Sequence, residues 1–137
     1  MNWKKFLLAG VAAFGTLFIF EFAIHNVLLK DLYQQTATLW RPMPEMMRLM
    51  WLMWILYFVI SFGMTFIYTK GYEPAKSGLG QGFRFGISVG LLLASSMSIG
   101  SYFSIPVPAE IAVYWFFGGM AMYAAVGTVI GLIYKPN

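Results

Sequence analysis

The sequence contains no cysteine, one histidine and few charged residues. Without cysteine the chain has no disulfides, thiolate metal sites or cysteine nucleophiles, and a single histidine excludes a bis-histidine haem site within one chain. Charged residues make up 10% of the 137 residues, whereas a soluble domain carries about 25%. Because hydrophobic residues reach 60% and the mean hydropathy is +0.71, the composition indicates an integral membrane protein.

The charged residues that are present exclude further classes of function. Nine Lys and Arg against five Asp and Glu give a net charge of +4, which is too sparse for a nucleic-acid interface. With one histidine, no cysteine and five scattered carboxylates, the sequence contains no catalytic triad and no HExxH motif. We therefore expect a protein that is not an enzyme, has no cofactor and no nucleic-acid partner, and contacts membrane lipids.

Four long apolar segments dominate the chain, and a bilayer core of about 30 Å needs about 20 apolar residues in a helix. They predict spans at about 6–29, 47–69, 80–103 and 110–134. The predicted fold is an all-α polytopic membrane protein: one domain over residues 1–137, with four transmembrane helices in a compact bundle of two hairpins. The first apolar run exceeds the roughly 7–15 residues of a signal-peptide core, so we expect an uncleaved span.

The positions of Lys and Arg predict the orientation. With four spans, both termini and the loop near residue 75 share one side of the membrane. That side carries six positive residues, Lys4, Lys5, Lys70, Lys76, Arg84 and Lys135, against Lys30, Arg41 and Arg48 on the other. The excess predicts cytoplasmic termini in a bacterial inner membrane. Interfacial aromatic residues agree, with Trp3, Tyr68, Tyr72 and Tyr134 at the inner side and Tyr33, Trp40, Trp51, Tyr102, Tyr114 and Trp115 at the outer side.

A weak parallel repeat relates the two halves of the chain. Pro42-x-Pro44, Trp51 and Gly63 are matched 64 residues later by Pro106-x-Pro108, Trp115 and Gly127. Chance explains this match equally well, because these residue types are common in membrane proteins, and both interpretations stay open.

Small residues at a spacing of four mark a helix face in the third segment. Within membranes such faces allow close backbone approach, which drives helix association. The stripe comprises Gly78, Gly82, Gly86, Gly90, Ala94 and Ser98, and the fourth segment adds Gly127 and Gly131. It predicts a tight helix–helix contact, with the partner either in the same chain or in another subunit.

Two titratable residues lie inside the first apolar segment. Glu21 and His25 share one helix face, and an intramembrane carboxylate is costly enough to need a partner or a task. We predict a polar cluster in the outer half of the bundle, formed by Glu21, His25, Arg48, Ser95, Ser98 and Glu110. Its role is structural pairing, a proton or cation pathway, or a metal site for which Glu21, His25 and Glu110 are weak candidate ligands.

The outer loop Lys30–Glu45 carries leucine, tyrosine and tryptophan that suit a segment lying in the membrane interface. It is interpreted as a lid or docking surface, or as an anchored connection.

Several stretches resemble a group of small bacterial four-span membrane proteins that are uncharacterised. They are Glu21-x-x-x-His25, Leu28-Leu29-Lys30-Asp31-Leu32-Tyr33-Gln34, Leu39-Trp40-Arg41-Pro42 and Lys70-Gly71-Tyr72-Glu73. The resemblance implies a four-helix membrane fold and no known activity.

Two functions from different classes follow. The first is a small accessory or assembly subunit of a larger membrane complex, which packs through the Gly-rich face against a protein partner or a second copy. The alternative is an oligomeric transporter or channel for protons or small cations that uses the Glu21–His25 pair. A membrane enzyme or redox carrier with a metal at the candidate ligands has the least support.

Overall fold

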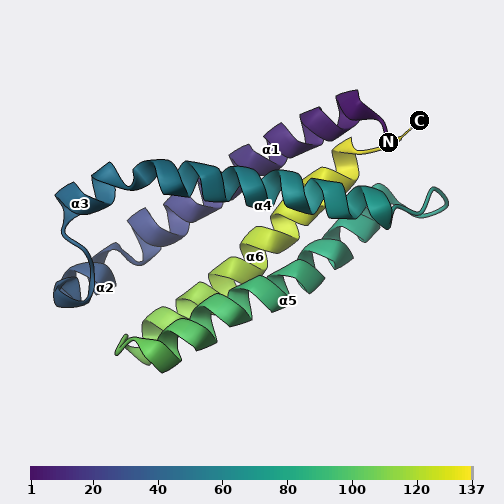
Figure 1. The fold of residues 1–137 in the computed structure, drawn as a ribbon. Coiled ribbons are helices and arrows are strands. Elements are labelled where there is room, and N and C mark those ends of the chain that lie inside the picture. Colours follow the sequence, from purple (N-terminus) through teal and green to yellow (C-terminus); the bar gives the residue numbers. More distant parts are fainter. Residues whose placement is uncertain (137) are drawn as a thin grey trace.

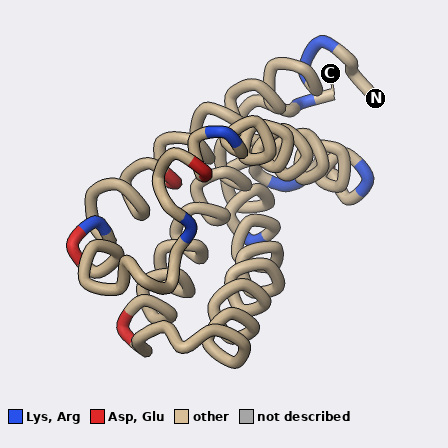
Figure 2. The backbone as a smooth tube through the Cα atoms, turned by 60° about the vertical axis from the view of Figure 1, so that its left-hand side comes forward, with Lys and Arg blue, Asp and Glu red and all other residues tan. Residues whose placement is uncertain are grey.

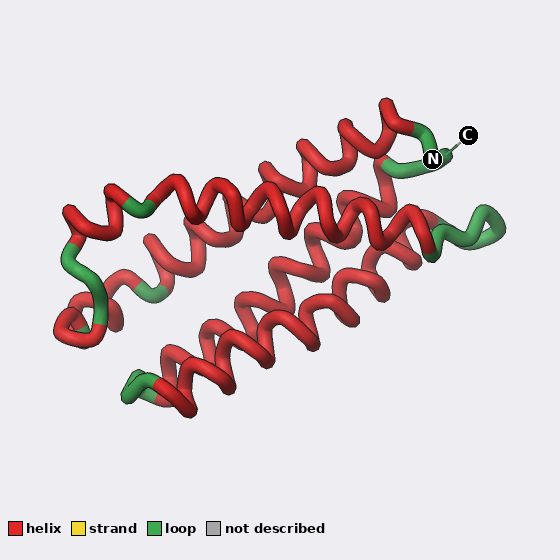
Figure 3. Tube along the Cα trace, viewed as in Figure 1, coloured by secondary structure: helices red, strands yellow, loops and turns green. Residues whose placement is uncertain are grey.

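The computed structural model describes residues 1–136, which are almost entirely helical (Figure 1; Figure 3). No strand occurs among these residues. Four helices are long and apolar enough to cross a membrane: Trp3–Leu28, Met50–Lys70, Gly78–Ser104 and Ala109–Ile133. The prediction of an all-α chain with four helices long and apolar enough to span a membrane is therefore confirmed for these residues, and each of these helices ends within three residues of the predicted position.

The first span consists of α1 (Trp3–Phe22) and its continuation η1 (Ala23–Leu28), which is a π-helix. Three short elements, α2 (Lys30–Gln35), η2 (Ala37–Leu39) and α3 (Met43–Arg48), connect it to the second span, α4 (Met50–Lys70). The third and fourth spans are α5 (Gly78–Ser104) and α6 (Ala109–Ile133).

Helices begin and end at residues whose backbone chemistry favours it. The side-chain oxygen of Asn2 accepts a hydrogen bond from the Lys5 backbone N–H at 3.1 Å and caps α1. Helix α5 ends at Ser104 because Ile105 precedes Pro106, and a residue before proline disfavours the helical conformation. Helix α6 then begins directly after Pro108, so the α5–α6 connection is short.

The spans form two close pairs, α1 with α4 and α5 with α6, which meet mainly through α1 and α6. Helices α4 and α5 are not among the closely packed pairs. Both termini and the 71–77 connection lie at one end of the molecule, called here the termini end (Figure 1). The opposite end, called the distal end, carries α2, α3 and the α5–α6 turn, and several of the Lys and Arg residues lie beside the termini (Figure 2).

The close approach of α5 and α6 depends on glycine. Gly78 faces the backbone of Gly131, and Gly82 faces Gly127 and lies so close to α6 that a Cβ there would be 3.0 Å from the Cα of Gly131. Gly86 meets the α6 backbone one turn farther on. The close partner of the glycine stripe is thus a helix of the same chain, and the remaining members of the stripe, all buried, are Gly90, Ala94 and Ser98.

Candidate functional site

Glu21 and His25 contact one another inside the first span. Their side chains are half-buried, and His25 Nε2 lies 3.2 Å from Glu21 Oε2. The spacing of four residues brings the two groups together because they share a face of the helix. The sequence prediction that these residues act on one face agrees with this geometry.

The π-helix η1 surrounds His25 and ends the span. The backbone N–H of Leu29 donates to the carbonyl of Ile24 at 2.9 Å, which is the wide turn that defines this helix type. Such π segments are rare and occur frequently at functional sites. The chain bends at Leu29, a fully buried residue between η1 and α2.

This change of direction brings Tyr33 of α2 back to His25. The two rings are nearly parallel, with an angle of 7° and a centroid distance of 5.9 Å, and the Tyr33 hydroxyl lies 2.6 Å from His25 Nδ1. Trp115 of α6 donates its indole N–H to the same hydroxyl at 2.7 Å. Glu21, His25, Tyr33 and Trp115 therefore form one hydrogen-bonded chain, called here the polar relay, that joins the two helix pairs.

The partners of each atom define where the protons lie. Because the Tyr33 oxygen accepts from Trp115, its own O–H is free to donate to His25 Nδ1. A neutral imidazole with its proton on Nε2 then donates to the Glu21 carboxylate. This tautomer follows from the hydrogen-bond network and satisfies every group in the polar relay.

Tyr33 lies outside the spans, and its environment keeps the hydroxyl protonated. Burial raises the pKa of the phenol from 10.0 to about 12; the Trp115 hydrogen bond lowers this pKa, and the charge of Glu21 raises it. Since the pKa of the folded state lies above that of the unfolded chain, the resulting stabilisation is complete below about pH 10 and is lost as the pH rises towards 12.

Aromatic side chains cover the polar relay at the distal end. The Trp40 ring stands edge-on to Tyr33 at 5.3 Å and to Trp115 at 6.1 Å. Its indole N–H donates to the Thr36 hydroxyl at 2.9 Å, which fixes the ring. The segment from α2 to Trp40 therefore lies over the relay, an arrangement that matches the lid interpretation of the outer loop.

A cavity of about 310 Å³ lies beside the polar relay. Glu21, His25 and Trp115 form part of its wall, with Ser96 as a further polar residue. Its other walls are apolar or aromatic and come from all four spans, namely Ile24, Leu56, Ile60, Leu93, Ala94, Met97, Gly119, Met122 and Tyr123. The polar relay thus faces a space that accommodates water or a small cation.

The other predicted cluster residues form no hydrogen bond or ion pair with Glu21 or His25 within residues 1–136. Arg48 ends α3 and Glu110 lies in the first turn of α6; both are exposed, and neither forms an ion pair within residues 1–136. Ser95 donates to the carbonyl of Leu91 in its own helix, and Ser98 is buried in the small-residue stripe.

The candidate metal site is not formed in the described part of the chain. No group of three or more His, Asp or Glu residues there is placed to hold a metal ion. The reason is that Glu110 lies exposed in the first turn of α6, so Glu21 and His25 lack the third ligand that the metal hypothesis required.

Sequence reasoning missed Tyr33 and Trp115 as members of the site. In a continuous helix Tyr33 would lie two turns beyond His25, and only the turn at Leu29 brings it back. Trp115 was assigned to the membrane interface, whereas its side chain is 7% exposed and reaches a residue 82 positions away. Its buried indole N–H needs an acceptor, which is the only signal that the residue type offers.

No protein-family model, curated protein or solved structure matches this chain. The resemblance to small four-span bacterial membrane proteins therefore stays an expectation.

Proposed function

We propose that this chain conducts protons across a membrane. The observation that carries the proposal is the polar relay, in which Glu21 and His25 of the first apolar helix are hydrogen-bonded in sequence to Tyr33. Intramembrane Glu and His side chains are the usual groups of proton pathways, because they bind and release protons near neutral pH or when paired.

The relay moves a proton by exchanging partners. His25 passes the proton on Nε2 to Glu21 Oε2, while Nδ1 takes the proton of the Tyr33 hydroxyl. Because the pKa of Tyr33 is about 12, a free phenolate is unfavourable, so a hydronium ion at the distal side must give its excess proton to Tyr33 in the same event and become water. Glu21 then holds one additional proton and its negative charge is neutralised.

Hydroxyl groups of α4 continue from Glu21 towards the termini end. Tyr57 lies within electrostatic reach of Glu21. Ser61 and Thr65 follow at a spacing of four residues, so they share a face with Tyr57, and both are fully buried. Their hydroxyls donate to α4 carbonyls and keep lone pairs that accept a proton or a water molecule.

The competing function, an accessory subunit that packs through its Gly-rich face, has weaker support. That face is occupied by α6 of the same chain, so an external partner needs another surface. Since four helices are few for an alternating-access machine, we also propose that the working unit contains more than one copy, which blue-native electrophoresis in a mild detergent tests.

The orientation and location of the chain belong to the same proposal. The six Lys and Arg residues of the termini end against three at the distal end favour cytoplasmic termini and a bacterial inner membrane. The polar relay would then lie in the outer half of the bilayer. The segment from α2 to Trp40, which lies over the relay, would contact the external medium. Cysteine labelling of single-cysteine variants in intact cells tests this orientation.

Reconstitution into liposomes tests proton conduction directly. Purified protein is incorporated with a pH-sensitive dye inside the vesicles, and a potassium gradient with valinomycin sets the potential. We expect wild type to change the internal pH and Glu21→Gln to fall to the rate of protein-free vesicles, since an amide cannot carry the proton. Glu110→Gln, which removes an exposed carboxylate outside the relay, is the matched control and keeps the wild-type rate.

The fold of each variant is checked by circular dichroism and gel filtration in the same detergent. A folded Glu21→Gln variant with wild-type flux would overturn the proposal.

A further inference from the structure

A second cavity, of about 440 Å³, lies at the termini end between α4 and α5. Tyr68 and Ile67 of α4 form one side of it, and Arg84, Phe85 and Ser88 of α5 form another. Helices α4 and α5 are not among the closely packed helix pairs, which leaves room for the cavity between them beside the contact of the Tyr68 and Phe85 rings. Its volume falls within the range of about 300–1,000 Å³ that is usual for small-molecule sites.

The cavity carries one positive charge that has no partner in the described chain. Arg84 is exposed and forms no ion pair within residues 1–136. Glu73, which also borders the cavity, is paired with Lys76, whose Nζ lies 2.6 Å from its Oε2. A guanidinium without a carboxylate partner is suited to bidentate binding of a phosphate.

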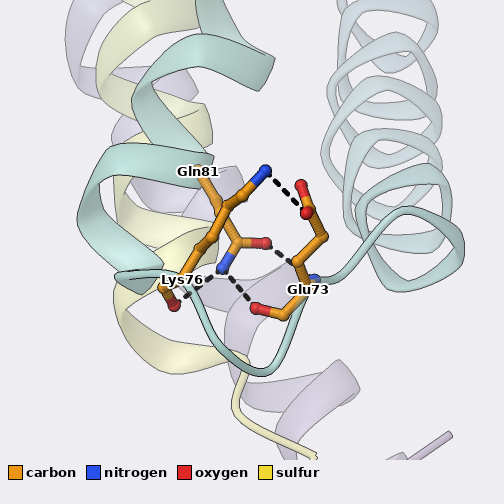
Figure 4. Close-up of polar contacts among 3 residues, drawn as sticks. All are labelled: Glu73, Lys76 and Gln81. Atoms are coloured by element: carbon orange, nitrogen blue, oxygen red, sulfur yellow. Dashed lines mark hydrogen bonds and ion pairs between the residues drawn. The ribbon is translucent and has the colours of Figure 1, made fainter.

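Two lining residues of the cavity, Gln81 and Glu73, are joined by hydrogen bonds. The Gln81 side chain accepts from the Glu73 backbone N–H at 2.8 Å and donates to the carbonyls of Glu73 and Lys76 at 2.9 and 3.0 Å (Figure 4). Figure 4 shows this amide enclosed by the 73–76 turn. Gln81 is itself buried, so the turn is held from inside and Arg84 projects from a fixed helix face one turn away.

Tyr68 supplies a second, independent observation. Its side chain is only 4% exposed, and its hydroxyl is buried with no hydrogen-bond partner within residues 1–136. A buried hydroxyl without a partner is destabilising, and unpaired groups of this kind are rare in folded proteins. A ligand oxygen in the cavity would accept the hydrogen bond that the protein leaves unmade.

We propose that this cavity binds the phosphate group of an anionic phospholipid. Arg84 would hold the phosphate, and the Tyr68 hydroxyl would donate a hydrogen bond to it. Ile67 and Phe85 provide an apolar wall for the lipid part next to the headgroup. Basic pockets between transmembrane helices at the cytoplasmic side are known to bind anionic headgroups, and the termini end carries most of the Lys and Arg of this chain.

Thermal unfolding in a mild detergent tests the site with three probes: phosphatidylglycerol, phosphatidylcholine and inorganic phosphate. We expect phosphatidylglycerol to raise the midpoint temperature of thermal unfolding of the wild type by several degrees, and the other two probes to change this temperature little. Arg84→Gln and Tyr68→Phe should each lose most of this shift. Lys4→Gln, which removes an exposed positive charge of the termini end outside the cavity, is the matched control and should keep it.

Tyr68→Phe separates ligand binding from folding. Without lipid this variant should be at least as stable as the wild type, because it removes only a buried hydroxyl that has no partner. The site would be overturned if Arg84→Gln and Tyr68→Phe kept the full shift, or if phosphatidylcholine gave an equal one. An equal shift with inorganic phosphate would overturn the lipid as its source. Because the site is independent of proton conduction, Glu21→Gln should keep the lipid response.

Discussion

Substituting Gly86 by alanine tests the contact on which the α5–α6 pair depends. A Cβ at this position would lie 2.8 Å from the Cα of Ala124 and 3.0 Å from the carbonyl carbon of Tyr123. Both atoms belong to the backbone of α6, so no side chain can rotate out of the way. The nearest backbone atom is the carbonyl oxygen of Tyr123, so the two helices have to separate until this contact and the one at Ala124 both reach at least 3.4 Å, where ordinary packing begins.

The change in the free energy of unfolding combines the cost of overpacking at the α5–α6 contact with the better helix propensity of alanine. A gap of about 0.5–1 Å forfeits a quarter to a half of the dispersion energy of the atoms along it. Overpacking costs about 1–3 kcal/mol, and contact with backbone places Gly86→Ala at the upper end, about 3 kcal/mol. Alanine improves the helix propensity by about 1 kcal/mol relative to glycine. We therefore expect a net loss of about 2 kcal/mol in the free energy of unfolding.

Unfolding in mixed detergent micelles with increasing sodium dodecyl sulfate, followed by circular dichroism, measures this loss. Gly100→Ala is the matched control on the same helix, because no atom lies within 4 Å of a Cβ at that position. It should gain up to about 1 kcal/mol, so that the two variants differ by about 3 kcal/mol. Equal stabilities of the two variants would refute the conclusion that glycine is required for the α5–α6 contact.

Three further predictions concern the polar relay and the 73–76 turn. Trp115→Phe should raise the pKa of Tyr33, because the indole N–H stabilises the phenolate, and Glu21→Gln should lower this pKa, because the negative carboxylate destabilises the phenolate. Ultraviolet titration measures both shifts when each variant is compared with the same variant carrying Tyr33→Phe. Shifts in the opposite directions would exclude this geometry. Thr65→Val, nearly equal in shape, should slow proton flux several-fold in liposomes without loss of fold, and an unchanged rate would remove α4 from the pathway. Gln81→Met removes three hydrogen bonds of a buried amide and should cost about 2 kcal/mol in detergent unfolding, whereas wild-type stability would show that the turn does not depend on this side chain.

The number and type of the helices were predictable because a bilayer imposes a length and a composition on each span. The four apolar segments needed no tertiary information to be identified. The two glycine stripes were also visible, since a spacing of four residues defines a helix face. That Gly82 meets Gly127 and not another subunit was not predictable, because a periodic pattern identifies a face without naming what covers it.

The polar site was predictable only in its local part. Glu21 and His25 are four residues apart on one helix, so their contact follows from helix geometry. Tyr33 joins them through a π-helix and a change of direction at Leu29, and neither has a sequence signature as clear as an apolar run. Trp115 reaches the site through the packing of α6 against the first span, which depends on tertiary structure.

The central claim is that a neutral His25 is held between Glu21 and Tyr33 as the middle of a hydrogen-bonded relay. Since the chain has one histidine, labelling with ¹⁵N-histidine gives nuclear magnetic resonance signals from this ring alone. In liposomes and alkaline buffer, the relay predicts a proton on Nε2, an unprotonated Nδ1, and a change of the Nδ1 signal in Tyr33→Phe but not in Tyr102→Phe. A proton on Nδ1 in the wild type, or an Nδ1 signal that ignores the loss of the Tyr33 hydroxyl, would contradict the claim.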